Sequence, residues 1–205
     1  MKKAGFLNVL RLSLTLLAIT AVMAAALAGV NKLTAGKIAA IEQEKKEQAI
    51  RQVMRWPNLE MHEVEFTDDT GLVKKVYRSQ RYYYGCEHPP TGDYYAYDYV
   101  VEVVTDGFNG EITMMVGIER GLCIMGLSVV SHTETAGLGA VVAADSEAAK
   151  LFKSQFANRS DAVAVTKDGG DIDAITGATI TSRAVCQGIN AALDCVHKLQ
   201  QEVQP

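Results

Sequence analysis

A cluster of hydroxyl groups stands at the start of the last helical stretch of the chain. Residues 173–181 read Asp-Ala-Ile-Thr-Gly-Ala-Thr-Ile-Thr, and a strongly periodic run follows them. The free N–H groups and the positive dipole end of a helix stabilise negative charge, and the small residues Gly177 and Ala178 let a bulky group approach the backbone. The segment therefore suits a phosphate. The alternative is that Thr179 or Thr181 only caps the helix.

A second polar segment follows an apolar stretch that predicts a strand. Residues 131–139 read Ser-His-Thr-Glu-Thr-Ala-Gly-Leu-Gly. A turn that leaves a buried strand can present backbone amides and hydroxyls to a ligand, and Gly137 and Gly139 remove the steric barrier to close approach. His132, taken alone, is more typical of a structural or surface histidine than of a catalytic one.

Composition argues against several other kinds of chemistry. The four cysteines form no CxxC pair, so neither an iron–sulfur cluster nor a zinc site has its usual ligand spacing. The sequence leaves open whether any of them forms a disulfide. The first thirty residues hold three basic and no acidic groups, so the remainder carries a formal net charge of −7 and has no basic cluster for binding nucleic acid. A glycine-rich dinucleotide fingerprint after a strand is also absent from the sequence.

The N-terminal residues predict a membrane-spanning helix. The run 12–30 carries no charge and follows Lys2, Lys3 and Arg11. At about 1.5 Å per residue, a helix of this length crosses a hydrocarbon core of about 30 Å. The positive-inside rule then keeps the N-terminus in the cytoplasm and sends the rest of the chain to the other side. A cleaved signal peptide, with cleavage near residues 26–28, is the alternative, but the apolar run is longer than most signal cores and favours a retained anchor.

The rest of the chain predicts a charged stalk and then one α+β domain. We expect residues 1–30 to form the cytoplasmic tip and membrane helix, 31–60 a charged helical stalk, and 61–205 the extracytoplasmic domain. The stalk is most simply a solvated helix, although a docking face for a partner subunit remains an alternative.

Alternating residues predict an antiparallel sheet in this domain. Strand patterns cover 63–84, 95–103, 111–119, 122–130 and, more briefly, 162–165. The tyrosine-rich stretch 95–103 alternates with Asp98 and Glu102, which predicts a half-buried strand. Residues 86–90, Cys-Glu-His-Pro-Pro, predict a loop without a metal.

Two helices complete the expected fold. Asp145 and Ser146 predict the cap of a helix over 147–156. The closing helix carries an apolar stripe that should pack on the sheet and that consists of Val185, Ile189, Leu193 and Val196.

Together, the two polar segments resemble the motifs of a family of covalent-FMN domains. That family carries an Asp followed by Ser/Thr-Gly-Ala-Thr-x-Thr, whose final Thr is joined to FMN through a phosphoester, and also His-x-Glu-Thr-Pro-Gly-Leu-Gly. The chain matches both in order, with Ala136 where proline is usual. The resemblance extends over the anchor, residues 107–139 and residues 173–182. It points to the G subunit of the Rnf complex and to the C subunit of the sodium-pumping NADH:quinone oxidoreductase.

The resemblance implies one covalent FMN per chain, attached to Thr181. Asp173 would serve recognition or Mg²⁺ binding during attachment by a flavin transferase that uses FAD as donor. No residue of the chain is expected to be catalytic or to bind a resident metal. The cofactor would be contacted by two groups of residues: Thr176, Gly177, Ala178 and Thr179 at the phosphate or ribityl chain, and His132, Glu134, Thr135, Gly137, Leu138 and Gly139 on the opposite wall.

The function implied is electron relay in a single-pass subunit of the cell (inner) membrane. The Rnf complex couples electron flow between ferredoxin and NAD⁺ to transport of Na⁺ or H⁺, and partner subunits would bind NAD⁺ and ferredoxin. The expected partners are these subunits, the flavin transferase and the lipid bilayer, with no nucleic acid. The alternatives are the C-type subunit, a stand-alone extracytoplasmic flavoprotein, and a tethered scaffold in which Thr181 is only a cap.

Overall fold

The computed structural model describes residues 2–54, 60–82, 95–119 and 121–203. The chain divides into two compact units, residues 1–44 and residues 45–205. The predicted division at residues 30 and 60 stays a prediction. The predicted loop at residues 86–90 lies outside the described residues.

The N-terminal unit is helical throughout its described length. Helix α1 covers Lys2–Val53 and therefore continues into the second unit. From residue 10 onward it contains an apolar stretch that is long enough to cross a membrane, and none of that stretch is buried within the protein. Leu12, Leu16 and Leu27 are each more than 60% exposed. Exposed leucines at this density suit a lipid environment far better than water.

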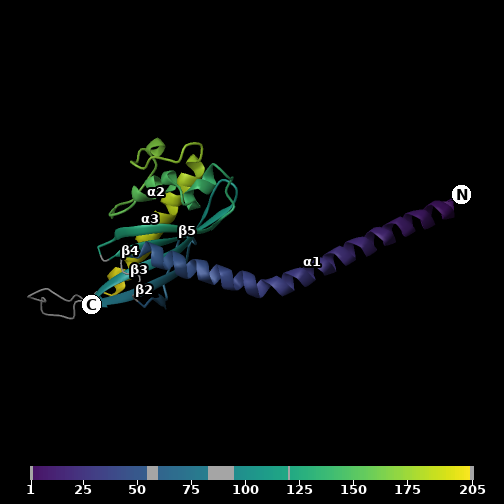
Figure 1. Cartoon of the computed structure of the whole chain (residues 1–205), viewed down its shortest axis with the longest axis horizontal. Coiled ribbons are helices and arrows are strands. Elements are labelled where there is room, and N and C mark those ends of the chain that lie inside the picture. The colour runs from purple at the N-terminus through teal and green to yellow at the C-terminus, as the bar shows by residue number, and fades with distance from the viewer. Residues whose placement is uncertain (1, 55–59, 83–94, 120, 204–205) are drawn as a thin grey trace, which may run out of the picture. The chain divides into compact units, whose positions relative to one another are not determined.

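The antiparallel sheet predicted from the sequence forms the centre of the second unit, and the described residues give it five strands (Figure 1). Its strands follow one another in chain order across the sheet. They are β1 (His62–Val64), β2 (Val73–Tyr82), β3 (Tyr95–Asp106), β4 (Glu111–Glu119) and β5 (Cys123–His132). In the described part of the chain, the remaining elements of this unit are the short 3₁₀ helices η1 (Gly139–Ala143) and η2 (Thr166–Asp168) and the α-helices α2 (Glu147–Ser154) and α3 (Thr179–Val203). The α+β architecture expected from the sequence is confirmed.

Helix α3 packs on one face of the sheet through the predicted apolar stripe. Val185 and Ile189 are completely buried, and they belong to the same core cluster as Val103 and Met114 of β3 and β4. Helix α2 is capped as predicted, since the Ser146 hydroxyl accepts a hydrogen bond from the backbone N–H of residue 149 at 3.2 Å. The main core thus lies between the sheet and α3.

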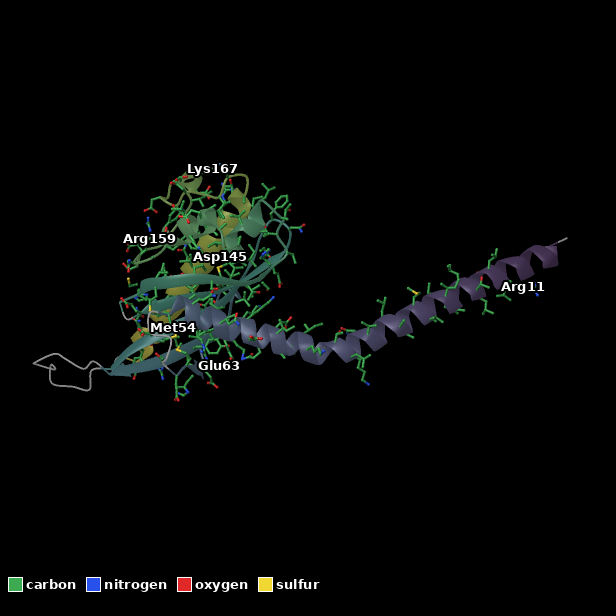
Figure 2. All side chains as sticks on the ribbon, in the orientation of Figure 1. Arg11, Met54, Glu63, Asp145, Arg159 and Lys167 are labelled. Carbon is green, nitrogen blue, oxygen red and sulfur yellow. The ribbon has the colours of Figure 1, made fainter. Side chains whose placement is uncertain are left out.

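The other face of the sheet is covered by the last turns of α1. Ala49, Val53 and Met54 form a second buried cluster with Val100 of β3 and Met115 of β4. Figure 2 shows Met54 where the end of α1 lies against the sheet. The strands are therefore covered on both faces at this position.

Two glycines allow this close approach of α1. A Cβ atom at Gly117 would fall below 3.0 Å from the carbonyl oxygen of Val53, whereas one at Gly126 would lie 3.3 Å from its Cα atom. The backbone of α1 therefore rests directly on the backbones of β4 and β5.

The expectation of a half-buried strand at 95–103 is wrong. Asp98 is completely buried and Glu102 is 4% exposed. The physical reason is the cover provided by α1, whose Lys46 ammonium lies 2.7 Å from a Glu102 carboxylate oxygen. Burial of this carboxylate is offset by an ion pair, which alternation along one strand cannot reveal.

The predicted strand at 162–165 is also wrong. Residues 162–165 contribute only one parallel bridge, between Val165 and Ile172. The backbone N–H and C=O of Val163 are instead bound by the side-chain amide of Asn190 on α3, at 2.8 and 2.9 Å. A side chain thus satisfies the backbone groups that a neighbouring strand would have paired.

Candidate functional site

The start of α3 opens onto a cavity of about 350 Å³. Four described segments line it: the turn after β3, the segment that follows β5, η2, and the residues around the first turn of α3. Its lining residues are Phe108, Glu134, Thr135, Leu138, Gly139, Lys167, Gly177, Ala178, Thr179, Ile180 and Thr181. The two polar segments singled out in the sequence therefore meet in one place.

Thr181 is the most buried threonine among the predicted site residues. Thr181 is 1% exposed, and its Oγ1 donates a hydrogen bond to Oε2 of Glu134 at 2.6 Å. The side chain therefore bonds to another element, and the alternative that Thr181 only caps α3 is wrong. Ser182, one residue later, serves the local backbone by accepting from the N–H of Ile175 and donating to the C=O of Ala178, both at 3.0 Å.

Glu134 is a buried carboxylate held by several contacts. Its Oε1 accepts the backbone N–H of Asn109 at 3.1 Å, and its own N–H donates to Nδ1 of His132 at 3.2 Å. Side chains at Gly107 and Gly139 would collide with it, because a Cβ at either position falls below 3.0 Å from a Glu134 carboxylate oxygen. The two glycines create the space in which the carboxylate reaches Thr181.

A cation lies beside the first turn of α3. The Lys167 ammonium donates to Oγ1 of Thr179 at 3.1 Å. Its neighbour Asp168 receives two hydrogen bonds of 2.6 Å from the Arg183 guanidinium, which ties η2 to α3. These hydrogen bonds lower the pKa of Asp168 below its ordinary value. In Figure 2, Lys167 lies at the end of the domain beyond α2.

Exposed apolar side chains surround the cavity. Phe108 is 66% exposed, Leu138 45% and Ile180 47%, although each lines this small cavity. Large apolar groups left in water around a polar centre are typical of a ligand site that accepts a flat or apolar group.

Not every predicted site residue lines this cavity. Gly137, Asp173 and Thr176 instead line a neighbouring cavity of about 600 Å³ beside α2, and His132 lies behind Glu134. The Gln155 side-chain amide fixes the backbone of Asp173, accepting its N–H at 2.7 Å and donating to its C=O at 3.1 Å. Asp173 is exposed, which suits recognition by another protein better than contact with the Thr181 hydroxyl.

Sequence reasoning missed Phe108, Lys167 and Ile180. Phe108 lies in the turn before β4 and Lys167 in η2, and neither belongs to the two motifs on which the predicted site rests. The signal was present for Lys167 alone, as a basic residue a few positions before a predicted anion site. Among the described residues, no group of three or more His, Cys, Asp or Glu side chains is arranged to hold a metal ion.

Comparison with known families matches both ends of the chain. The FMN-binding domain matches residues 107–194, and the RnfG N-terminal region matches residues 1–53. The G subunit of the ion-translocating oxidoreductase complex of Methanosarcina acetivorans is 31% identical over 192 residues, which span 92% of this chain and 95% of that protein. The chain belongs to the family of G subunits of ion-translocating oxidoreductase complexes. The resemblance seen in the two motifs is thereby confirmed.

Other G subunits are also similar in sequence to this chain, over different shares of its length. The corresponding G subunit of Shewanella piezotolerans is 30% identical over 94% of this chain and 89% of its own length. The G subunit of the proton-translocating ferredoxin:NAD(+) oxidoreductase complex of Clostridium ljungdahlii is 40% identical over 48% of this chain and 52% of its own length. The chain matches about half the length of the G subunit of Vibrio cholerae, at 39% identity.

The residues of the cavity fit the FMN group that this family's domain is named for. Lys167 and the first turn of α3 offer positive charge and N–H donors to a phosphate. Phe108, Leu138 and Ile180 offer apolar surface to a flat ring. Among the described residues that line the cavity, Glu134 does not suit a phosphate, because it is a carboxylate within hydrogen-bonding distance of Thr181.

Proposed function

We propose that the chain carries one FMN, joined through a phosphoester to Thr181, and relays electrons in an Rnf-type complex. The observation that carries the proposal is the placement of the Thr181 hydroxyl in the first turn of α3, inside a cavity that also holds Lys167. The family membership supports FMN as the cofactor. When bound, the flavin ring accepts and passes on electrons, while the protein fixes its position.

Each group in the cavity has a separate task in this proposal. The first N–H groups of α3 and the Lys167 ammonium hold the phosphate. Phe108, Leu138 and Ile180 keep water from part of the ring. The predicted contacts of Thr176, Gly137 and His132 would be indirect or would lie at the edge of the neighbouring cavity.

Attachment requires an outside enzyme. Threonine is a weak nucleophile at neutral pH, so we infer a flavin transferase that uses FAD as donor. Asp173, held by Gln155 at the protein surface, would be read by that enzyme. A covalent bond would keep the flavin in a compartment where a dissociated cofactor is lost.

The membrane setting belongs to the same proposal. Helix α1 would cross the cell membrane once, with the basic N-terminus in the cytoplasm and the FMN domain on the outer side. The complex as a whole would couple ferredoxin:NAD⁺ oxidoreduction to transport of Na⁺ or H⁺, with NAD⁺ and ferredoxin bound by other subunits. The relatives described above are G subunits, which favours this complex over the quinone-reducing pump.

Intact-mass measurement of the full chain tests the proposal. Protein produced together with the flavin transferase should gain the mass of one FMN less one water, and peptide mapping should place it on Thr181. Thr181→Ala should abolish the gain, whereas Thr67→Ala, at an exposed threonine of the same domain, should retain it. Covalent flavin that persists in Thr181→Ala, or that maps to Thr179, would contradict the assignment.

A further inference from the structure

The contact between Glu134 and Thr181 places a buried carboxylate beside the hydroxyl, and the binding of a phosphate does not explain why a carboxylate lies there. Glu134 is 8% exposed, and none of the ion pairs among the described residues includes its carboxylate. Its hydrogen-bond donors are the backbone N–H of Asn109 and the hydroxyl of Thr181. Burying a carboxylate without a cation costs several kcal/mol, so such a group calls for a functional reason.

The surrounding backbone is adapted to this carboxylate. The absence of side chains at Gly107 and Gly139 leaves room for one carboxylate oxygen each. The backbone N–H of Glu134 is fixed by the His132 ring, which sets the direction in which the side chain leaves the chain. The result is an acceptor 2.6 Å from the oxygen that must act as the nucleophile.

We propose that Glu134 is the general base for flavin attachment, so that the base comes from the chain that receives the flavin and not from the transferase. This inference rests on the proposed attachment of FMN to Thr181. As the Thr181 oxygen attacks the phosphorus of FAD that becomes the FMN phosphate, its O–H bond breaks and the proton passes to Oε2 of Glu134. The new bond joins Oγ1 to phosphorus, the P–O–P bond of FAD breaks, and AMP leaves with the bonding electron pair.

The charge balance favours this direction of proton transfer. The product is a phosphodiester with a negative charge, formed beside what was a buried carboxylate. Taking the proton neutralises Glu134 in the same step, so two anions do not face each other in the closed cavity. Lys167, which lines the same cavity and contacts Thr179, remains to balance the charge of the phosphate.

The experiment measures the rate of attachment to the full chain in detergent. The chain is made in a host that lacks flavin transferase and is then mixed with purified transferase, FAD and Mg²⁺, and intact mass is followed with time. Glu134→Gln is the main variant, because the amide oxygen still accepts the Thr181 hydroxyl but is not basic. Glu111→Gln, at an exposed glutamate of β4, is the matched control.

The expected result is a fall of about 100-fold or more in the rate for Glu134→Gln, the usual range for loss of a general base, and no change for Glu111→Gln. Glu134→Asp, which keeps a carboxylate on a shorter side chain, should recover part of the rate even if the Gln variant is less stable. Calorimetry of the unmodified variants shows whether each is folded.

Two results would overturn the inference while leaving the attachment site intact. If Glu134→Gln is modified at the rate of the wild type, the carboxylate only holds the hydroxyl. If it is modified faster, Glu134 instead closes residues 133–139 over Thr181 and obstructs the transferase. Failure of the wild-type chain to gain FMN at Thr181 would refute the proposed function itself.

Discussion

The packing of α1 on the sheet predicts different effects for the same substitution at two positions. Gly117→Ala and Gly126→Ala each add one methyl group beneath Val53. At Gly117 the methyl would fall below 3.0 Å from a backbone carbonyl oxygen, which cannot rotate away as a side chain does. At Gly126 the nearest atom of Val53 would be 3.3 Å away, so a shift of a few tenths of an ångström suffices.

These clearances give the expected size of each effect. Overpacking a well-packed interior costs about 1–3 kcal/mol, so Gly117→Ala should lower the free energy of unfolding of the domain by about this amount. For a domain of this size that corresponds to a fall in Tm of roughly 2–12 °C. Gly126→Ala should stay within about 1 kcal/mol of the wild type, because the small strain is opposed by the lower backbone entropy of alanine in the unfolded chain.

Differential scanning calorimetry of the full chain in detergent measures both variants. Calorimetry is preferable to far-UV circular dichroism, since the long helix α1 contributes a strong signal that need not change when the domain unfolds. The reasoning is refuted if Gly117→Ala melts at the temperature of the wild type, or if the two variants are destabilised equally.

Three further predictions concern the region around the start of α3. Lys167→Gln should weaken binding of free FMN by the unmodified chain about tenfold, because it removes one charged hydrogen bond of about 1.5 kcal/mol. Lys150→Gln, on the surface of α2, should leave the affinity unchanged. Fluorescence titration with FMN measures both affinities. Burial raises the pKa of the Cys186 thiol to about 11, so at pH 8 about one molecule in a thousand carries the thiolate. Peptide mapping after alkylation of the native protein should find Cys123 labelled well before Cys186. The hydrogen bonds from Arg183 lower the pKa of Asp168 in the folded state. The stabilisation of the folded protein by this carboxylate is therefore present above the pKa of about 3.9 of the unfolded chain, and it is lost as the pH falls from there through the lower pKa of the folded state. The difference in Tm between the wild type and Asp168→Asn should shrink below about pH 4.

The fold was predictable where local pattern and packing agree. The stripe Val185, Ile189, Leu193 and Val196 has helical period, and α3 buries it as expected. The prediction of a strand at 162–165 was wrong because the side chain of Asn190, more than twenty residues later, forms the hydrogen bonds of the Val163 backbone. A pattern within one segment carries no record of such a distant partner.

The site was predictable only in part for the same reason. Thr181 and Glu134 stood out because each lies in a recognisable motif, but their hydrogen bond joins residues that are far apart in the chain. Glu102 was assigned to a solvated face, because nothing in its own strand shows that Lys46 covers it. Phe108 was not among the predicted site residues, and its contribution to the cavity arises from the folded arrangement alone.

The position of Thr181 on α3 limits how a flavin attached there can move. The later turns of the same helix are part of the core, so the phosphate end of the cofactor would be a pivot as immobile as the sheet itself. Only the ribityl chain would then separate this pivot from the ring, so the ring would stay close to the cavity that Phe108 and Leu138 line. An electron donor or acceptor would have to approach that cavity, and any larger change in the distance between redox partners would require the whole domain to move.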